Sequence, residues 1–195
     1  CASCHGLKHV AYRSLEGLGY NKDQINRIAA QFQIDDLPNE EGEIFKRGAI
    51  YSDYFVEPYE NYNVAKAANN GAYPPDFSLM VKARKDGANY IRSLLLGYTD
   101  TPDGFDVGEG YYNKYMAGNI IAMPQPLYGD DVEYKDGTNA SLEQEVNDLV
   151  TFLTWTSMPD LEDRRSAGLK VIFFLFIMTI VFYLSYRKIW SELKK

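Results

Sequence analysis

Two cysteines and a histidine stand at the start of the chain in the pattern Cys-x-x-Cys-His. Cys1, Cys4 and His5 include both cysteines and one of the two histidines of the 195 residues. Two thiols at this spacing reach the two vinyl groups of one haem and form thioethers, and the adjacent imidazole then lies beneath the iron as an axial ligand. The spacing therefore predicts one covalently attached haem c.

Two other kinds of site use the same residue types. A redox-active Cys-x-x-Cys pair needs no histidine and usually occurs in a βαβ setting, which the sequence pattern does not indicate. A zinc site needs two further ligands, and His9 is the only one nearby. A disulfide and a zinc site stay as alternatives, but haem attachment also accounts for His5. His9 is more simply a partly exposed histidine one helical turn later.

An electron-carrying haem needs a second axial ligand, and the chain has no third histidine. A methionine thioether is the natural choice, and five are available: Met80, Met116, Met123, Met158 and Met178. Met178 lies in a long apolar run and Met80 in a helical pattern. Met123 and Met158 each precede a proline, which stiffens the loop around them. A position late in the chain, within the sequence IAMPQPL, favours Met123 over the other candidates.

The charge of the chain is unevenly distributed. Residues 1–163 carry 13 basic and 26 acidic side chains, whereas residues 164–195 carry seven basic and one acidic. An acidic body argues against a nucleic-acid partner, which would require a basic face. The acidic side chains gather in three groups: Asp35, Asp36, Glu40, Glu41 and Glu43; Asp100, Asp103, Asp106 and Glu109; and Asp130, Asp131 and Glu133. We expect the second and third groups to steer a basic partner, and the first to be a solvated surface.

A C-terminal segment has the length and composition of a membrane span. Residues 171–186, VIFFLFIMTIVFYLSY, contain no charge, and residues 167–186 make about 30 Å of helix. Tyr183, Tyr186 and Trp190 lie near one end, as interfacial aromatic residues do. A buried core helix is the alternative, but the basic flanks argue against it. The basic excess on the short C-terminal side, which includes Lys194 and Lys195, favours that side as cytoplasmic.

The chain therefore divides into a haem-binding body, residues 1–163, and an anchor with a short basic tail, residues 164–195. Apolar spacing and end signals predict helices in the body over residues 22–32, 64–70, 78–85 and 88–98. A capping box of Ser141 and Gln144 predicts the start of another helix. Residues 35–62 and 99–138 are irregular, and residues 132–138 are a candidate for half of a hairpin.

The whole chain resembles the cytochrome c1 family. The motifs that carry the resemblance occur in this order before the apolar run: CASCHGLKHVAYRSLEGLGY, PNEEGEIFKRG, AANNGAYPPDFSLMVKARKDGANYI, SLLLGYTDTPDGF, EGYYNKYMAGNIIAMPQPLYGD and TFLTWTSMPDLEDRRSAGLK. The resemblance implies a mainly α fold, with a cytochrome c-like haem domain, long irregular loops and one C-terminal transmembrane helix. It implies Cys1 and Cys4 as thioether sites and His5 and Met123 as axial ligands. It further implies the following residues near the haem: Arg84 and Tyr90 at the propionates, and Asn69 in the pocket lining.

The same resemblance implies an electron carrier that is not a complete enzyme by itself. It would take electrons from a Rieske iron–sulfur subunit and pass them to a soluble or membrane-bound cytochrome c, within ubiquinol–cytochrome c reductase (respiratory complex III). Cytochrome b would be a further partner, and we expect the complex to be dimeric. The alternatives are an anchored cytochrome c feeding a terminal oxidase and a haem-based sensor. We expect a bacterial inner membrane with the haem domain in the periplasm, or else a mitochondrial inner membrane with that domain in the intermembrane space.

Overall fold

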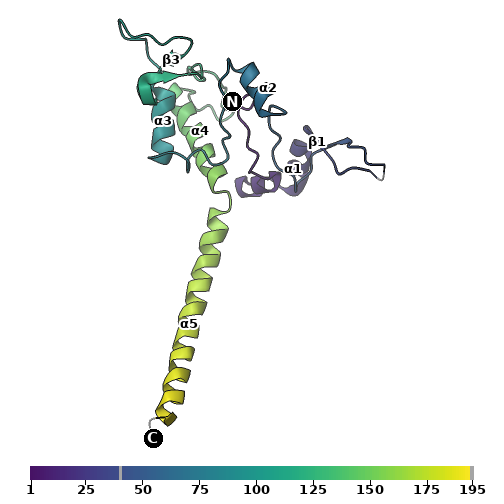
Figure 1. Cartoon of the computed structure of the whole chain (residues 1–195), viewed down its shortest axis with the longest axis vertical. Coiled ribbons are helices and arrows are strands. Elements are labelled where there is room, and N and C mark those ends of the chain that lie inside the picture. The colour runs from purple at the N-terminus through teal and green to yellow at the C-terminus, as the bar shows by residue number, and fades with distance from the viewer. Residues whose placement is uncertain (40, 194–195) are drawn as a thin grey trace. The chain divides into compact units, whose positions relative to one another are not determined.

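The computed structural model describes residues 1–39 and 41–193, so Glu40, Lys194 and Lys195 lie outside the described residues. The chain forms two compact units, Cys1–Met158 and Pro159–Lys195. The predicted mainly α class is confirmed, with two small antiparallel sheets in the first unit (Figure 1). The elements in chain order are η1 (Tyr12–Leu18), α1 (Lys22–Ala29), β1 (Gln33–Asp35), β2 (Lys46–Gly48), α2 (Tyr62–Ala68), α3 (Gly87–Leu96), β3 (Tyr111–Tyr112), η2 (Ala117–Asn119), β4 (Ile120–Ile121), α4 (Leu142–Ser157) and α5 (Leu161–Leu193).

Helix α1 begins at a capping box. The Asn21 side chain accepts a hydrogen bond from the Gln24 backbone N–H at 3.0 Å, and the Gln24 side chain accepts one from the Asn21 N–H at 2.9 Å. This exchange satisfies two backbone donors that a helix start otherwise leaves free. The helix buries Ile25 in a cluster with Tyr12, whose ring stacks on that of Phe55 at 4.4 Å. Tyr12 and Leu15, which follow the Cys-x-x-Cys-His segment, are held in this cluster.

Strands β1 and β2 are joined to the following loop by one arginine. Arg47 donates two hydrogen bonds to the Asp53 carboxylate, at 2.6 and 3.1 Å, and its Nε lies 3.0 Å from Asp36 Oδ2. A forked guanidinium–carboxylate pair is among the stronger charged contacts in proteins. The hydrogen bonds from Arg47 hold the pKa of Asp53 below its ordinary value. Asp53 is therefore more acidic in the folded chain than in the unfolded chain.

This lowered pKa predicts an acid-sensitive contribution to stability. A carboxyl group whose pKa falls on folding stabilises the fold above its unfolded pKa, near 3.9, and loses that contribution as pH falls through the folded pKa. We expect the free energy of unfolding to decrease with acid below about pH 4, and to decrease less steeply in Asp53→Asn. Denaturant titrations across this pH range measure both slopes. Asp35→Asn, at an exposed position of β1, is the control; equal slopes for the two variants would contradict the assignment.

Helices α3 and α4 pack against each other around the larger apolar cluster of the first unit. The buried members are Met80, Ile91, Leu95, Val146, Val150 and Leu153. Ser141 caps α4 as predicted, because its side chain accepts a hydrogen bond from the Gln144 N–H at 3.3 Å. The predicted box is incomplete, since the Gln144 amide instead donates to Asp148 at 3.0 Å. The helix therefore begins where the sequence predicts, with one of the two expected bonds.

The prediction of a helix over residues 78–85 is wrong: this segment is a series of turns. Ser78 is buried, and its N–H donates to Asp76 Oδ1 at 2.9 Å while its hydroxyl accepts from the His9 N–H at 3.1 Å. The bond to Asp76 is local, and such bonds give the backbone an alternative to helical bonding. The bond to His9 ties Ser78 to a segment 69 positions away. Asp86, just after the segment, has a positive φ of 66°, so the turns also end in a non-helical conformation.

The prediction of a hairpin strand over residues 132–138 is also wrong, since no strand forms there. This stretch is held to α4 by side chains: the Tyr134 hydroxyl donates to Asp148 at 2.6 Å, and the Asp131 N–H donates to Glu145 at 2.9 Å. The irregular stretch contains a hairpin elsewhere, in which β3 pairs with β4. That hairpin directly precedes Met123.

Helix α5 is confirmed as a C-terminal helix long and apolar enough to cross a membrane. It has 33 residues and a mean hydropathy of 2.3 in its most apolar stretch, which is not buried in the structure. At about 1.5 Å per residue the helix is about 50 Å long, which exceeds the hydrocarbon thickness of a bilayer. Its apolar side chains are exposed around the whole circumference, as a lipid-facing helix requires.

Candidate cofactor site

The Cys-x-x-Cys-His segment is folded into one tight turn. The backbone N–H groups of Cys4 and His5 both donate to the Cys1 carbonyl at 3.0 Å. Both cysteines are free thiols; Cys1 is exposed and Cys4 is half-buried. Across residues 1–39 and 41–193, no group of three or more His, Cys, Asp or Glu side chains is placed to hold a metal ion. The backbone turn thus brings Cys1, Cys4 and His5 into one short loop.

The imidazole of His5 has a defined orientation. Its Nδ1 lies 2.8 Å from the Pro75 carbonyl oxygen, which only accepts hydrogen bonds, so Nδ1 carries the proton. Nε2 is then left with a free lone pair, as in histidines whose second nitrogen binds a metal. The ring stacks on Phe77 at a centroid distance of 3.9 Å, and burial lowers the pKa of His5. Both effects favour a neutral, oriented ligand.

The Cys4 thiol is the start of a short hydrogen-bonded chain. The Tyr59 hydroxyl donates to Cys4 Sγ at 3.6 Å, and the Asn69 amide donates to the Tyr59 oxygen at 3.1 Å. Asn69 caps the end of α2, where its amide also donates to the Ala65 carbonyl at 2.7 Å. The structure therefore connects Asn69 to the thiol through Tyr59 rather than by direct contact.

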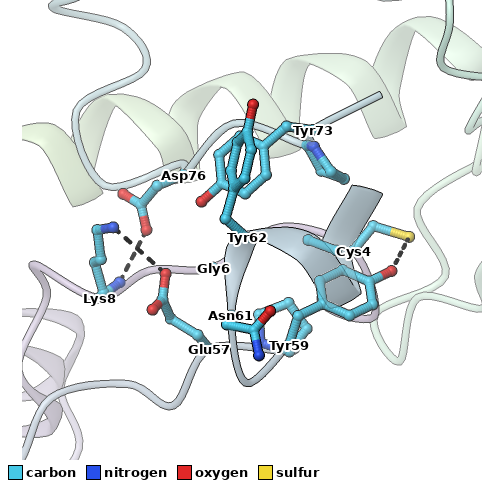
Figure 2. A pocket seen from close by; sticks show the side chains of 12 residues that line it. Cys4, Gly6, Lys8, Glu57, Tyr59, Asn61, Tyr62, Tyr73 and Asp76 are labelled. Atoms are coloured by element: carbon cyan, nitrogen blue, oxygen red, sulfur yellow. Dashed lines mark hydrogen bonds and ion pairs between the residues drawn. The ribbon is translucent and has the colours of Figure 1, made fainter. Parts of the chain in front are cut away.

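A pocket opens beside Cys4, and tyrosine rings form much of its wall (Figure 2). Its volume is about 240 Å³. Gly6 lies in the wall, where a Cβ would come 3.3 Å from Asp76 Oδ2 and 3.4 Å from Glu57 Cγ. Lys8 contacts the same two carboxylates. Its ammonium lies 3.5 Å from Glu57 Oε1, and its backbone N–H donates a hydrogen bond to Asp76 Oδ2 at 3.0 Å. Tyrosine faces with polar edges are suited to the side of a flat, partly polar group.

Met123 packs against the apolar cluster between α3 and α4. Its side chain is half-buried and packs against the α3–α4 cluster, and Phe77, which stacks on His5, packs there too. The Tyr98 hydroxyl donates to the Met123 carbonyl at 3.0 Å. Burial raises the pKa of Tyr98, so this hydroxyl keeps its proton at neutral pH. Met123 and Phe77, the residue on which the His5 ring stacks, thus pack against the same cluster.

The two residues expected at the propionates lie in different surroundings. Tyr90, on α3, packs against the cluster, and its hydroxyl donates to Met116 Sδ at 3.8 Å. Arg84 is exposed, and its Nη1 lies 3.3 Å from the Ala83 carbonyl. The structure therefore brings Tyr90 to the cluster that holds Met123. It places Arg84 on the surface, in the turns before α3.

The other methionines have other positions. Met80 is buried in the α3–α4 cluster, and Met158 follows the last residue of α4. Met178 lies within α5. Met116, in the irregular stretch, is half-buried and contacts Tyr90. Met123 differs from these in having its backbone tied to a residue at the end of α3.

Three residues of the site were not predicted from the sequence: Tyr59, Pro75 and Tyr98. Each acts through a hydrogen bond to a residue far away in the chain, so no local spacing marks it. Tyr59 is 55 positions from Cys4, and Pro75 is 70 positions from His5. For the two tyrosines the signal in the sequence is composition, since the chain has 16 tyrosines.

The sequence of this helical chain matches known proteins over its whole length. The chain belongs to the Cytochrome C1 family, whose profile matches residues 1–193. It is 45% identical over 195 residues to "Cytochrome c1 2, heme protein, mitochondrial" of Arabidopsis thaliana, and it spans 64% of that protein's length. It is 40% identical over 211 residues to "Cytochrome c1" of Rhodospirillum rubrum, spanning 78% of it. It is 43% identical over 196 residues to "Cytochrome b-c1 complex catalytic subunit, mitochondrial" of Candida albicans, spanning 68% of it.

These relatives include mitochondrial and bacterial proteins, and each alignment covers all of this chain. The resemblance seen in the sequence motifs is therefore confirmed at the level of the family.

Proposed function

We propose that this chain is a membrane-anchored c-type cytochrome that carries electrons within ubiquinol–cytochrome c reductase. The observation that carries the proposal is the His5 geometry. The imidazole is oriented by the Pro75 carbonyl at 2.8 Å and belongs to a turn that also presents two free thiols. A protonated Nδ1 leaves Nε2 for a metal, and the adjacent thiols are the groups that haem attachment consumes.

The donor set fits one haem c. Cys1 and Cys4 would form the thioethers, and His5 Nε2 and the Met123 thioether would be the axial ligands. Tyr90, Asn69 and Arg84 are proposed near the macrocycle. When bound, the haem iron supplies one-electron chemistry. The chain's residues orient the ligands, and the thioether of a methionine raises the potential relative to a second imidazole.

The partners follow from the complex to which a relative's name refers. The Candida relative is named as a subunit of the cytochrome b-c1 complex. We infer that this chain assembles with cytochrome b and a Rieske iron–sulfur subunit in a dimeric complex, and that its electron acceptor is a cytochrome c. No substrate bond is made or broken at its proposed site, so the enzymatic reaction belongs to the assembly.

The proposed location is the inner membrane of a bacterium, with the body in the periplasm; a mitochondrial inner membrane with the body in the intermembrane space is the alternative. The C-terminal end of α5 is basic, which favours that end on the cytoplasmic or matrix side. The body then lies on the opposite side of the membrane.

Electron flow through the complex tests this function. The complex is purified in mild detergent, a ubiquinol is added in a stopped-flow instrument, and the absorbance of the chain's haem is followed. We expect rapid reduction by quinol and re-oxidation by added cytochrome c. A haem that quinol does not reduce in the assembled complex would contradict the proposal and favour an oxidase-linked carrier or a sensor.

The body is expected to be separable from the anchor. The compact unit that contains both apolar clusters ends at Met158, so its core does not depend on α5. Cleavage at a protease site inserted between Asp160 and Ala167 should release a soluble fragment that retains haem, measured as haem absorbance in the supernatant after ultracentrifugation. Uncleaved chain is the control. Haem that stays with the membrane after complete cleavage would contradict the prediction.

The acidic groups near Met123 are expected to speed the encounter with a basic cytochrome c. Asp130, Asp131 and Glu133 are exposed in the segment that follows Met123. Exposed charges are screened over about 8–10 Å at physiological salt. Neutralising all three should lower the association rate by about tenfold at low salt and flatten its salt dependence, because steering raises on-rates by 10- to 1000-fold. Stopped-flow oxidation of the haem at several ionic strengths measures this rate.

Asn is the replacement at position 131, because the Asp131 carboxylate accepts a hydrogen bond from the Tyr128 N–H at 2.6 Å and an amide oxygen preserves an acceptor. The control neutralises Asp35, Glu41 and Glu43, an equal charge change in the first acidic group. A rate that is independent of salt in the unmodified protein would refute steering and indicate an acceptor held permanently in the complex.

A further inference from the structure

The end of α3 lies against the segment that carries the proposed sixth ligand. Tyr98 follows this helix, and its hydroxyl donates to the Met123 carbonyl at 3.0 Å across 25 positions of chain. We propose that Tyr98 is a positioning residue that holds the Met123 loop in place and thereby keeps the sixth coordination position closed. This inference rests on the proposed function, because it takes Met123 as the axial ligand.

The backbone next to Tyr98 is tightly packed. Gly97, directly before it, is buried so tightly that a Cβ would lie 2.7 Å from the Tyr115 ring and 2.8 Å from Asn113 Oδ1. The Gly97 carbonyl accepts a hydrogen bond from the Lys114 N–H at 3.0 Å. Tight packing on both sides fixes the point from which the Tyr98 side chain extends.

The hairpin before Met123 is fastened to the same helix end. Asn113 is fully buried, and its amide donates to the Leu94 carbonyl at 2.8 Å while its Oδ1 accepts from the Tyr115 N–H at 3.0 Å. Its backbone N–H donates to the Asn119 carbonyl at 2.9 Å. These bonds hold the β3–β4 hairpin, which extends to Ile121, against the end of α3.

Among the described residues, few hydrogen bonds connect the loop beyond Ile121 to the rest of the chain. Pro124 and Pro126 lack a backbone N–H and so cannot donate hydrogen bonds. The Gln125 amide donates to the Leu127 carbonyl at 2.8 Å, which closes the loop on itself rather than onto the helices. Leu127 packs against the α3–α4 cluster and anchors the far end. Between these anchors, the Tyr98 hydroxyl is the hydrogen-bonded tether that reaches Met123 itself.

A tether at the Met123 backbone affects the position of its thioether. A ligand held by its supporting contacts stays within the distance that coordination requires, whereas a loose loop lets it leave more often. Carbon monoxide binds ferrous iron only when the sixth position is open, so its binding rate reports how often Met123 leaves. Loss of one hydrogen bond should raise that rate roughly fivefold, the factor that corresponds to a typical net hydrogen bond.

The test compares Tyr98→Phe, which keeps the ring but removes the hydroxyl, with Tyr128→Phe in the full-length haem-loaded chain. Tyr128 is highly exposed on the same loop, so its hydroxyl is the matched control. In Tyr98→Phe we expect faster carbon monoxide binding, a lower midpoint potential, and faster hydrogen exchange of the amides between Ala122 and Tyr128. The control should match the unmodified chain in all three.

Unchanged exchange in Tyr98→Phe would overturn the inference, and so would faster exchange without faster carbon monoxide binding. Failure of the proposed function has a different signature: the unmodified chain would carry no attached haem or would bind carbon monoxide freely. Free binding to the unmodified chain would overturn the inference as well, since the sixth position would already be open. In a chain without haem, the exchange rates alone decide whether Tyr98 holds the loop.

Discussion

Replacing Met123 with leucine should leave the haem attached and open its sixth coordination position. The proposed thioether bonds would be made by Cys1 and Cys4, so attachment would not depend on Met123. Leucine fills a similar volume in the half-buried site but has no sulfur, so the iron loses a ligand. We expect ferrous protein that binds carbon monoxide and a midpoint potential lower by on the order of 100 mV, within the roughly 0.8 V range that axial ligands span.

Redox titration and carbon monoxide difference spectra measure these two effects. Met116→Leu is the matched control, because Met116 lies in the same irregular stretch and is half-buried like Met123. The control should keep a closed sixth position and a nearly native potential. A Met123→Leu protein with a native potential and no carbon monoxide binding would show that another residue is the ligand.

Replacing His5 with alanine should have the larger effect on the holoprotein. The change removes the proposed proximal ligand, the hydrogen bond to the Pro75 carbonyl and the stacking on Phe77. Without that ligand beside the thiols, haem would not be held for the proposed attachment at Cys1 and Cys4. We expect the yield of covalently bound haem to fall more than tenfold, and any haem that does attach to lose the spectrum of a low-spin His–Met iron.

The chain supplies its own control for this experiment in His9, its second histidine. His9 is exposed, and it is its backbone N–H that donates to Ser78, so His9→Ala preserves that bond. Haem staining after denaturing electrophoresis gives the yield for each variant relative to the amount of protein. Equal yields for His5→Ala and His9→Ala would contradict the assignment of His5 as the proximal ligand.

Most helices could be predicted from the sequence because their signals are local. The apolar spacing of α1, α3 and α4 and the uncharged run of α5 each lie within one element. Residues 78–85 also have helical spacing, but the buried Ser78 bonds to Asp76 and His9 instead. Residues 132–138 have a turn-like composition, but Tyr134 binds α4 in place of a partner strand. Both errors arise from contacts between segments that spacing does not reveal.

In the candidate site too, residues that are adjacent in sequence could be predicted, and residues that reach the site from far along the chain could not. Cys1, Cys4 and His5 are adjacent in sequence, so their chemistry is visible in the residues themselves. Tyr59 and Tyr98 reach the site from 55 and 25 positions away, through hydroxyl groups that no spacing rule identifies. The resemblance to a family provided Arg84 and Tyr90 as candidates, and the structure brings only Tyr90 to the cluster beside Met123.

Covalent haem attachment is tested most directly by the mass of the peptide that contains Cys1 and Cys4. The chain is isolated from its native membrane, denatured in acid to remove any non-covalent haem, digested, and analysed by tandem mass spectrometry. We expect a peptide that carries one haem bound through thioethers to both Cys1 and Cys4, with neither thiol available to alkylating reagent. A peptide with two alkylatable thiols, or with a reducible disulfide between them, would contradict it.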